Sequence, residues 1–199
     1  ILVISETNRK STVHRPAHTN YIGVKRFDKN KNLIGEARFI GLYTADAYHS
    51  DPRNIPFLGL KIKKILKKSN FSLDGHAAKT LVNILETLPR DVLFQASVDE
   101  LYTLAVNILQ LQERRRTRLF VRRDIYHRFV SCFVFLPQDV LSAELVLKMQ
   151  KILEKAFDSK ESKFSVFIPE SILGRIDYIV RTDSKKPLHY DVNEIEQEL

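Results

Sequence analysis

The stretch Phe129-Val-Ser-Cys-Phe-Val-Phe-Leu136 decides the fold class of this sequence. It is the most apolar strand-like run in the chain, and apolar side chains occupy nearly all positions on both of its alternating faces. That composition is typical of a central strand in a sheet that is covered on both sides. Pro137 ends the run, because proline has no backbone N–H to donate to a neighbouring strand.

The segments around this run predict a small α/β unit. From Phe129 onward the order is strand, helix, strand, strand, helix. One further strand would complete the β-α-β-β-α-β order of ferredoxin-like folds. Arg118–Arg123 also has a strand pattern, and it either adds an edge strand or replaces the missing one. The segments after Leu136 are a helix over 142–157, strands over 164–168 and 176–181, and a helix that begins at 192.

The first part of the chain predicts a β-hairpin followed by helices. Two strands flank Asp28–Asn32, whose Asn, Asp and Lys content is typical of a hairpin turn. Residues 44–56 predict a loop or a short helical turn. The last of three amphipathic helices begins at Ser97, with Glu100 at the spacing of a capping box. The predicted segments are a short apolar strand over 1–5, a polar connection over 6–20, strands over 21–27 and 33–43, and helices over 56–69, 73–88 and 97–113.

These patterns predict an α+β chain of two domains. Residues 1–113 would hold the β-hairpin and the three-helix segment. Residues 114–199 would form a ferredoxin-like α/β sandwich with an antiparallel sheet, truncated before its last strand. A single domain fits the same order of elements, because in GAF-like or PAS-like folds the two strand pairs share one antiparallel sheet. The preference for short connections and sequential pairing does not choose between the two.

Positive charge is concentrated at one end of the sequence. The chain of 199 residues has a formal net charge of +8, yet residues 1–70 carry +9 and residues 71–199 carry −1. Five lysines of the first helix lie on a helical pattern beside an apolar stripe, which is typical of a solvated helix face. A second basic cluster, between Arg114 and Arg123, contains a single aromatic residue, Phe120. We therefore expect no nucleic-acid partner. The five lysines are Lys61, Lys63, Lys64, Lys67 and Lys68.

Composition also limits the compartment and the membrane association. No apolar run approaches the roughly 20 residues that span a bilayer. The one cysteine, Cys132, cannot form a disulfide framework within the chain, so a reducing cytoplasm is the expected setting. Cys132 lies in the middle of the central strand, which predicts a buried and inert thiol.

No residue of the sequence is predicted to be catalytic, to bind a cofactor or to ligate a metal. The six glycines are isolated, so neither a phosphate-binding loop nor a dinucleotide fingerprint is present. His14 and His18 have the i, i+4 spacing of zinc ligands on a helix, but Pro16 lies between them and no third ligand is close in sequence. No nucleophile, base and orienting group suggest themselves as a set.

Several stretches, taken in order, resemble the amino-terminal region of the large bacterial NAD-specific glutamate dehydrogenases. Two departures from the family pattern are small: Val92 replaces an acidic residue, and Leu73–Lys79 is looser. The stretches are Ser11-Thr-Val-His-Arg-Pro16, Tyr21-Ile-Gly-Val-Lys-Arg-Phe27, Arg38-Phe-Ile-Gly-Leu-Tyr-Thr44 with Tyr48, Asn83-Ile-Leu-Glu-Thr-Leu-Pro-Arg-Asp91 with Leu93-Phe-Gln95, Leu111-Gln-Glu-Arg114, Arg118-Leu-Phe-Val-Arg-Arg-Asp124 and Arg128-Phe-Val-Ser-Cys132.

The resemblance implies a regulatory or assembly segment of a larger enzyme. The parent enzymes oxidise L-glutamate to 2-oxoglutarate and ammonia with NAD, and their catalytic domain lies downstream of the matched region. That region is described as containing ACT-like modules, the ferredoxin-like type associated with amino-acid regulation. The expected partners are the remainder of the parent chain, further copies in a homo-oligomer, and an amino-acid effector. The alternative is a free-standing small-molecule sensor of the ACT or GAF type.

Overall fold

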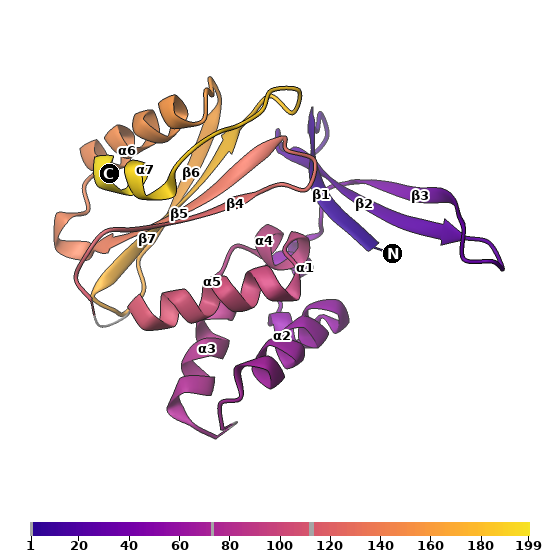
Figure 1. Ribbon diagram of the computed structural model, residues 1–199, viewed down its shortest axis with the longest axis horizontal. Helices are drawn as coiled ribbons and strands as arrows, with labels where there is room; N and C mark the ends of the chain where they lie inside the picture. The colour runs from indigo at the N-terminus through magenta and orange to yellow at the C-terminus, as the bar shows by residue number, and fades with distance from the viewer. Residues whose placement is uncertain (1, 73, 112–113) are drawn as a thin grey trace. The chain divides into compact units, whose positions relative to one another are not determined.

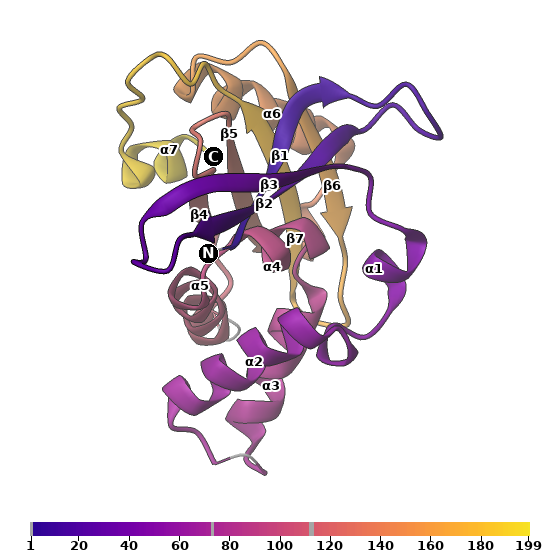
Figure 2. The same cartoon turned by 90° about the vertical axis from the view of Figure 1, so that its right-hand side faces the viewer.

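The computed structural model describes residues 2–72, 74–111 and 114–199. The chain divides into two compact units, Ile1–Leu109 and Gln110–Leu199. Each contains one antiparallel sheet together with helices, as the ribbons in Figures 1 and 2 show. The strands therefore form two separate sheets, and the single-sheet GAF-like or PAS-like alternative is wrong. The α+β class and the antiparallel sheet expected in the second unit are confirmed.

The sheet of the first unit has three strands in the order β1-β2-β3. The predicted hairpin is confirmed: β2 pairs antiparallel with β3, and the Asp28 carboxylate accepts hydrogen bonds from the backbone N–H groups of Asn30 and Asn32 (both 2.8 Å). The polar connection predicted over 6–20 is wrong at both ends, because β1 and β2 extend into it. Polar side chains in these extensions pair across the two strands: the hydroxyls of Thr7 in β1 and Thr19 in β2 form a hydrogen bond of 2.6 Å. The strands are β1 Leu2–Lys10, β2 His18–Phe27 and β3 Leu33–Gly41.

The helices of the first unit bury the apolar stripes that the sequence predicts. Helix α2 has the predicted bounds, and the capping box is confirmed: Glu100 N–H donates to Ser97 Oγ (3.2 Å), and Ser97 N–H donates to Glu100 Oε2 (2.7 Å). Helix α4 was not predicted, because it has only six residues and directly follows Pro89. The helix predicted over 73–88 corresponds to α3, and its predicted first residue, Leu73, lies outside the described residues. The helices are α1 Ala45–His49, η1 Pro52–Asn54, α2 Pro56–Ser69, α3 His76–Thr87, α4 Arg90–Gln95 and α5 Val98–Leu111.

The sheet of the second unit has four strands in the order β4-β5-β7-β6. Strand β5 lies between β4 and β7, and all of Phe129–Leu136 is buried, which confirms the predicted central strand. Strand β7 is antiparallel to both β5 and β6, so the β5-α6-β6 unit is split by an inserted strand. The elements are β4 Arg118–Arg123, β5 Phe129–Pro137, η2 Gln138–Val140, α6 Ala143–Ala156, β6 Ser162–Phe167, β7 Leu173–Arg181 and α7 Val192–Glu198.

Strand β4 takes the fourth place in this sheet, beside β5. Arg118–Arg123 therefore forms an edge strand beside β5, which is one of the two placements that the sequence left open. Helices α6 and α7 lie on one face of the sheet (Figure 1). The core beneath them contains Cys132, Val134, Met149, Leu153, Tyr178 and Ile195, among other residues.

Hydrogen bonds of Tyr178 and Glu196 fix α6 and α7 to the sheet. The buried Tyr178 hydroxyl donates to the backbone carbonyl of Val146 in α6 (2.8 Å). Glu196 of α7 accepts hydrogen bonds from Arg118 Nη1 and from the backbone N–H of Leu119, both at 2.8 Å. Strand β4 therefore supplies the Glu196 carboxylate with two donors. Among the described helices, none is both long and apolar enough to cross a membrane.

Candidate functional site

The residues that the sequence singled out do not come together. His14 lies in the loop between β1 and β2 with a left-handed φ of 65°. His18 begins β2, and its Nδ1 lies 3.1 Å from the backbone oxygen of Thr7. Within the described part of the chain, no group of three or more His, Cys, Asp or Glu side chains is placed to hold a metal ion. Cys132 is a free and fully buried cysteine, and burial raises the pKa of its thiol, so the predicted inert thiol is confirmed.

An aromatic and ionic cluster in the first unit joins segments that are distant in sequence. Tyr48 Oη donates to Asp91 Oδ1 at 3.1 Å, and the guanidinium of Arg15 lies over the Tyr48 ring, 5.2 Å from its centroid. The ring of Tyr43 lies 6.0 Å from that of Tyr48 and 4.8 Å from that of Phe94. These five residues all belong to stretches that carry the family resemblance, so three of those stretches converge here.

The cluster ties the segment around α1 to the start of α4. Arg90 Nη2 donates to the backbone carbonyls of Tyr48 (3.2 Å) and Ser50 (2.9 Å). Burial, with the nearby Asp91 carboxylate, raises the pKa of both Tyr43 and Tyr48, so both phenols remain protonated. Within the described residues, Tyr43 Oη and Arg90 Nε and Nη1 are buried without a hydrogen-bond partner. Sequence reasoning missed this cluster because its contacts join residues about 40 positions apart.

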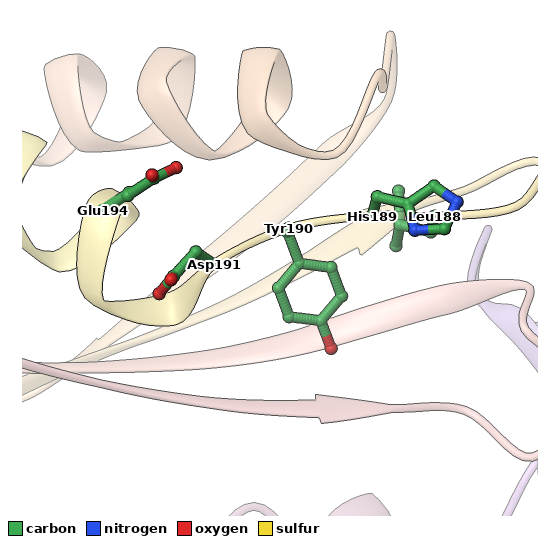
Figure 3. A pocket seen from close by; sticks show the side chains of 5 residues that line it. All are labelled: Leu188, His189, Tyr190, Asp191 and Glu194. Atoms are coloured by element: carbon green, nitrogen blue, oxygen red, sulfur yellow. The ribbon is translucent and has the colours of Figure 1, made fainter.

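A pocket of about 490 Å³ lies in the second unit, beside the start of α7. Figure 3 shows the five side chains that line it, with Asp191 and Glu194 at the first turn of α7. Asp191 caps this helix by accepting a hydrogen bond from the backbone N–H of Asn193 (2.7 Å). The lining residues are Leu188, His189, Tyr190, Asp191 and Glu194.

The pocket combines a fixed aromatic side with a negatively charged side. The Tyr190 ring packs edge-on against Phe157, with centroids 5.1 Å apart, and burial raises the pKa of the Tyr190 phenol. Two carboxylates beside a neutral phenol attract a small cationic group rather than an anion. Sequence reasoning missed this pocket because residues 182–191 carry no periodic pattern or motif.

Two family models match the chain, one over the helices of the first unit and one over the second unit. The model described as "Glutamate dehydrogenase, helical motif 1" matches residues 55–114, which contain α2 to α5. The model described as "Glutamate dehydrogenase, ACT2 domain" matches residues 118–199, which contain the four-stranded sheet with α6 and α7.

Three curated proteins similar to this chain are named NAD-specific glutamate dehydrogenase. The protein of Halomonas elongata is 40% identical over 199 residues, and that of Pseudomonas aeruginosa is 37% identical over the same length. The protein of Mycobacterium tuberculosis is 27% identical over 181 residues, or 91% of this chain. The chain spans only about 12% of the length of the first two relatives. With helical motif 1 and the ACT2 domain in consecutive order, the chain belongs to the NAD-specific glutamate dehydrogenase family.

Proposed function

We propose that this chain is a non-catalytic regulatory and assembly segment of an NAD-dependent glutamate dehydrogenase. The parent enzyme would convert L-glutamate, NAD and water into 2-oxoglutarate, ammonia and NADH in the cytoplasm, as a homo-oligomer. NAD would bind to the remainder of the parent chain. The observation that carries this proposal is the match of the ACT2 model to residues 118–199. The 40% identity over 199 residues to an NAD-specific glutamate dehydrogenase supports it.

The expected ligand of the ACT2 unit is an amino acid. Its ammonium group fits the pocket at α7, where Asp191 and Glu194 supply two carboxylates and Tyr190 supplies an apolar wall. Such a ligand controls an enzyme only when it binds one arrangement of the parent more tightly than another. Helix α7 is suited to transmit binding, because Glu196 ties it to β4 at the edge of the sheet.

Catalysis by the isolated chain is the first test. The 199-residue chain, incubated with L-glutamate and NAD, is expected to form no NADH, because the proposed role leaves the chemistry to the remainder of the parent. NADH absorbance over time measures this directly, with an intact glutamate dehydrogenase as the positive control. Turnover above the buffer background would contradict the non-catalytic role.

Ligand binding by the pocket is the second test. An amino acid present at 100 times its dissociation constant should stabilise the chain by about 2.7 kcal/mol, which a thermal-shift screen detects as a higher melting temperature. Glu194→Gln removes one charge-assisted contact, typically about 1.5–3 kcal/mol, and should largely abolish the shift. Glu198→Gln is the matched control, because Glu198 lies on the same helix and does not line the pocket.

Two outcomes would contradict the effector proposal. One is the absence of a shift with every amino acid tested, which would leave assembly as the role of the segment. The other is an equal shift in the Glu194→Gln and Glu198→Gln variants, which would place the ligand away from this pocket.

A further inference from the structure

Strand β3 is an exposed edge of the first unit's sheet, next to β2 alone in the strand order β1-β2-β3. Four of its large apolar side chains are more than half exposed, with values of 59% for Leu33, 61% for Ile34, 58% for Phe39 and 65% for Ile40. Because successive side chains alternate, these residues place apolar groups on both faces of the strand. A long apolar edge of this kind is a template for pairing with another strand.

The sequence of β3 is complementary to itself when two copies run antiparallel. The strand reads Leu33-Ile-Gly-Glu-Ala-Arg-Phe-Ile-Gly41, and Ala37 is its central residue. With Ala37 opposite Ala37 of a second copy, each Glu36 lies opposite an Arg38, and each Ile34 lies opposite an Ile40. Opposite charges and apolar pairs in these positions both stabilise antiparallel strands.

The same register covers the glycine positions of the strand. Gly35 lies opposite Phe39 of the second copy, an arrangement in which the aromatic ring covers the exposed glycine backbone. Moving the axis by one residue, which shifts the pairing by two residues, would place Glu36 opposite Glu36 or Arg38 opposite Arg38, with like charges facing each other. Charge therefore favours the register centred on Ala37 over its two nearest neighbours.

In the unpaired strand the Glu36 carboxylate is held over β2, so the pairing requires it to turn from Tyr21 toward the free edge of β3. Tyr21 Oη donates to Glu36 Oε1 at 2.6 Å, across Gly23 of β2. A Cβ atom at Gly23 would lie 1.8 Å from Glu36 Oε1, so this contact requires glycine there. Arg38 Nε lies 3.7 Å from Glu36 Oε2, and the Arg38 side chain is 67% exposed, which leaves its guanidinium open to a second carboxylate.

We propose that β3 pairs antiparallel with β3 of a second copy of this chain, about a two-fold axis through Ala37. The contact is isologous, with the same surface on both copies, and it joins two three-stranded sheets into one of six strands. This inference rests on the assembly part of the proposed function and does not depend on effector binding.

Cysteine cross-linking at the axis tests the pairing and its register. Residues opposite each other in an antiparallel pair have Cα atoms about 4.5–5.5 Å apart, within the range of about 4.4–6.8 Å that a disulfide spans. Ala37→Cys should therefore form a covalent dimer under mild oxidation, visible on a non-reducing gel. The native Cys132 is buried and should not compete.

Ile34→Cys is the matched control on the same strand. In the proposed register its two copies lie about 20 Å apart, so no disulfide should link them. The pairing is contradicted when Ala37→Cys stays monomeric, or when Ile34→Cys cross-links as fast as Ala37→Cys.

A charge exchange tests the same surface without cysteine chemistry. Arg38→Glu places two acidic residues opposite each other at both pairs, and Glu36→Arg places two basic residues there. Each variant alone should dimerise at least about tenfold more weakly than the original chain in sedimentation velocity. An equimolar mixture of the two should recover the dimer, because every acidic residue then faces a basic one.

Arg9→Glu is the control for net charge. Arg9 is an exposed residue of β1, at the opposite edge of the sheet, and this variant changes the charge of the chain as much as Arg38→Glu does. It should dimerise like the original chain. Loss of the dimer in Arg9→Glu, or failure of the mixed variants to recover it, would overturn the proposal.

Discussion

Asp177→Ala is expected to lower the free energy of unfolding of the second unit by about 3–5 kcal/mol, because it removes the carboxylate that compensates the buried charge of Arg175. Arg175 and Asp177 are neighbours on one face of β7, and they are 4% and 9% exposed. Their contact is bidentate: Arg175 Nε donates to Asp177 Oδ1 at 2.6 Å, and Nη2 donates to Oδ2 at 3.0 Å. Equilibrium urea unfolding of the chain, followed by circular dichroism, measures the loss.

A double replacement separates the cost of breaking this pair from its net value. Burial raises the pKa of the Asp177 carboxyl, although the Arg175 guanidinium opposes that shift. The ionised carboxylate is therefore disfavoured by folding, and this part of the stability is lost as the pH rises through the raised pKa. The double variant Arg175→Met/Asp177→Leu should accordingly unfold within about 1 kcal/mol of the original chain, or be more stable.

The exposed pair of Arg115 and Asp139 is the control for the Asp177 prediction. Arg115 Nη2 and Asp139 Oδ2 lie 2.9 Å apart, but both side chains are more than 60% exposed. Asp139→Ala should therefore cost less than about 1 kcal/mol. Equal losses in the free energy of unfolding in Asp177→Ala and Asp139→Ala would contradict the prediction that burial makes the first pair more costly to break.

Lys61→Met is expected to destabilise the first unit by about 2–3 kcal/mol, because three backbone carbonyls lose a charged donor. Lys61 Nζ in α2 donates to the carbonyls of Leu93 (2.8 Å), Phe94 (2.8 Å) and Ala96 (2.6 Å), which end helix α4. A positive charge at this position also complements the negative end of the helix dipole. The sequence had placed Lys61 on a solvated face with its neighbours, and this is wrong.

Lys64→Met on the same helix is the matched control for Lys61. Lys64 is exposed, so its replacement should change the stability by no more than about 0.5 kcal/mol. Hydrogen exchange read by mass spectrometry should show faster exchange in Arg90–Gln95 for the Lys61 variant alone. Similar exchange in both variants would refute the role of Lys61 in holding α4.

Local patterns explain what could be predicted from the sequence. The apolar run at Phe129–Leu136 identifies a central strand without any other information, since a strand buried on both faces needs apolar residues at nearly every position. The bounds of α2 and the Ser97–Glu100 capping box follow from rules that act within four residues. The split arrangement of the second unit follows from the order of elements, once β4 takes the fourth place.

Contacts between distant segments explain what could not be predicted. Lys61, Tyr48 and Glu196 each have a residue type that is common on protein surfaces, and their partners lie more than 30 positions away. The extension of β1 to Lys10 depends on pairing with β2, so its polar residues resemble a loop when read alone. The pocket at α7 likewise has no local signature.

The position of β4 in the chain affects the order in which the second unit folds. Strand β4 precedes β5 and pairs with it through a short hairpin, where Asp124 N–H donates to the carbonyl of Phe129 at 3.0 Å. A strand at the far end of the sequence would have to close a loop around the whole unit before it could pair. Local pairing lowers the contact order, which favours fast folding. During synthesis, β4 and β5 are the first strands of this unit to leave the ribosome, so α6 emerges when a two-stranded surface is already available.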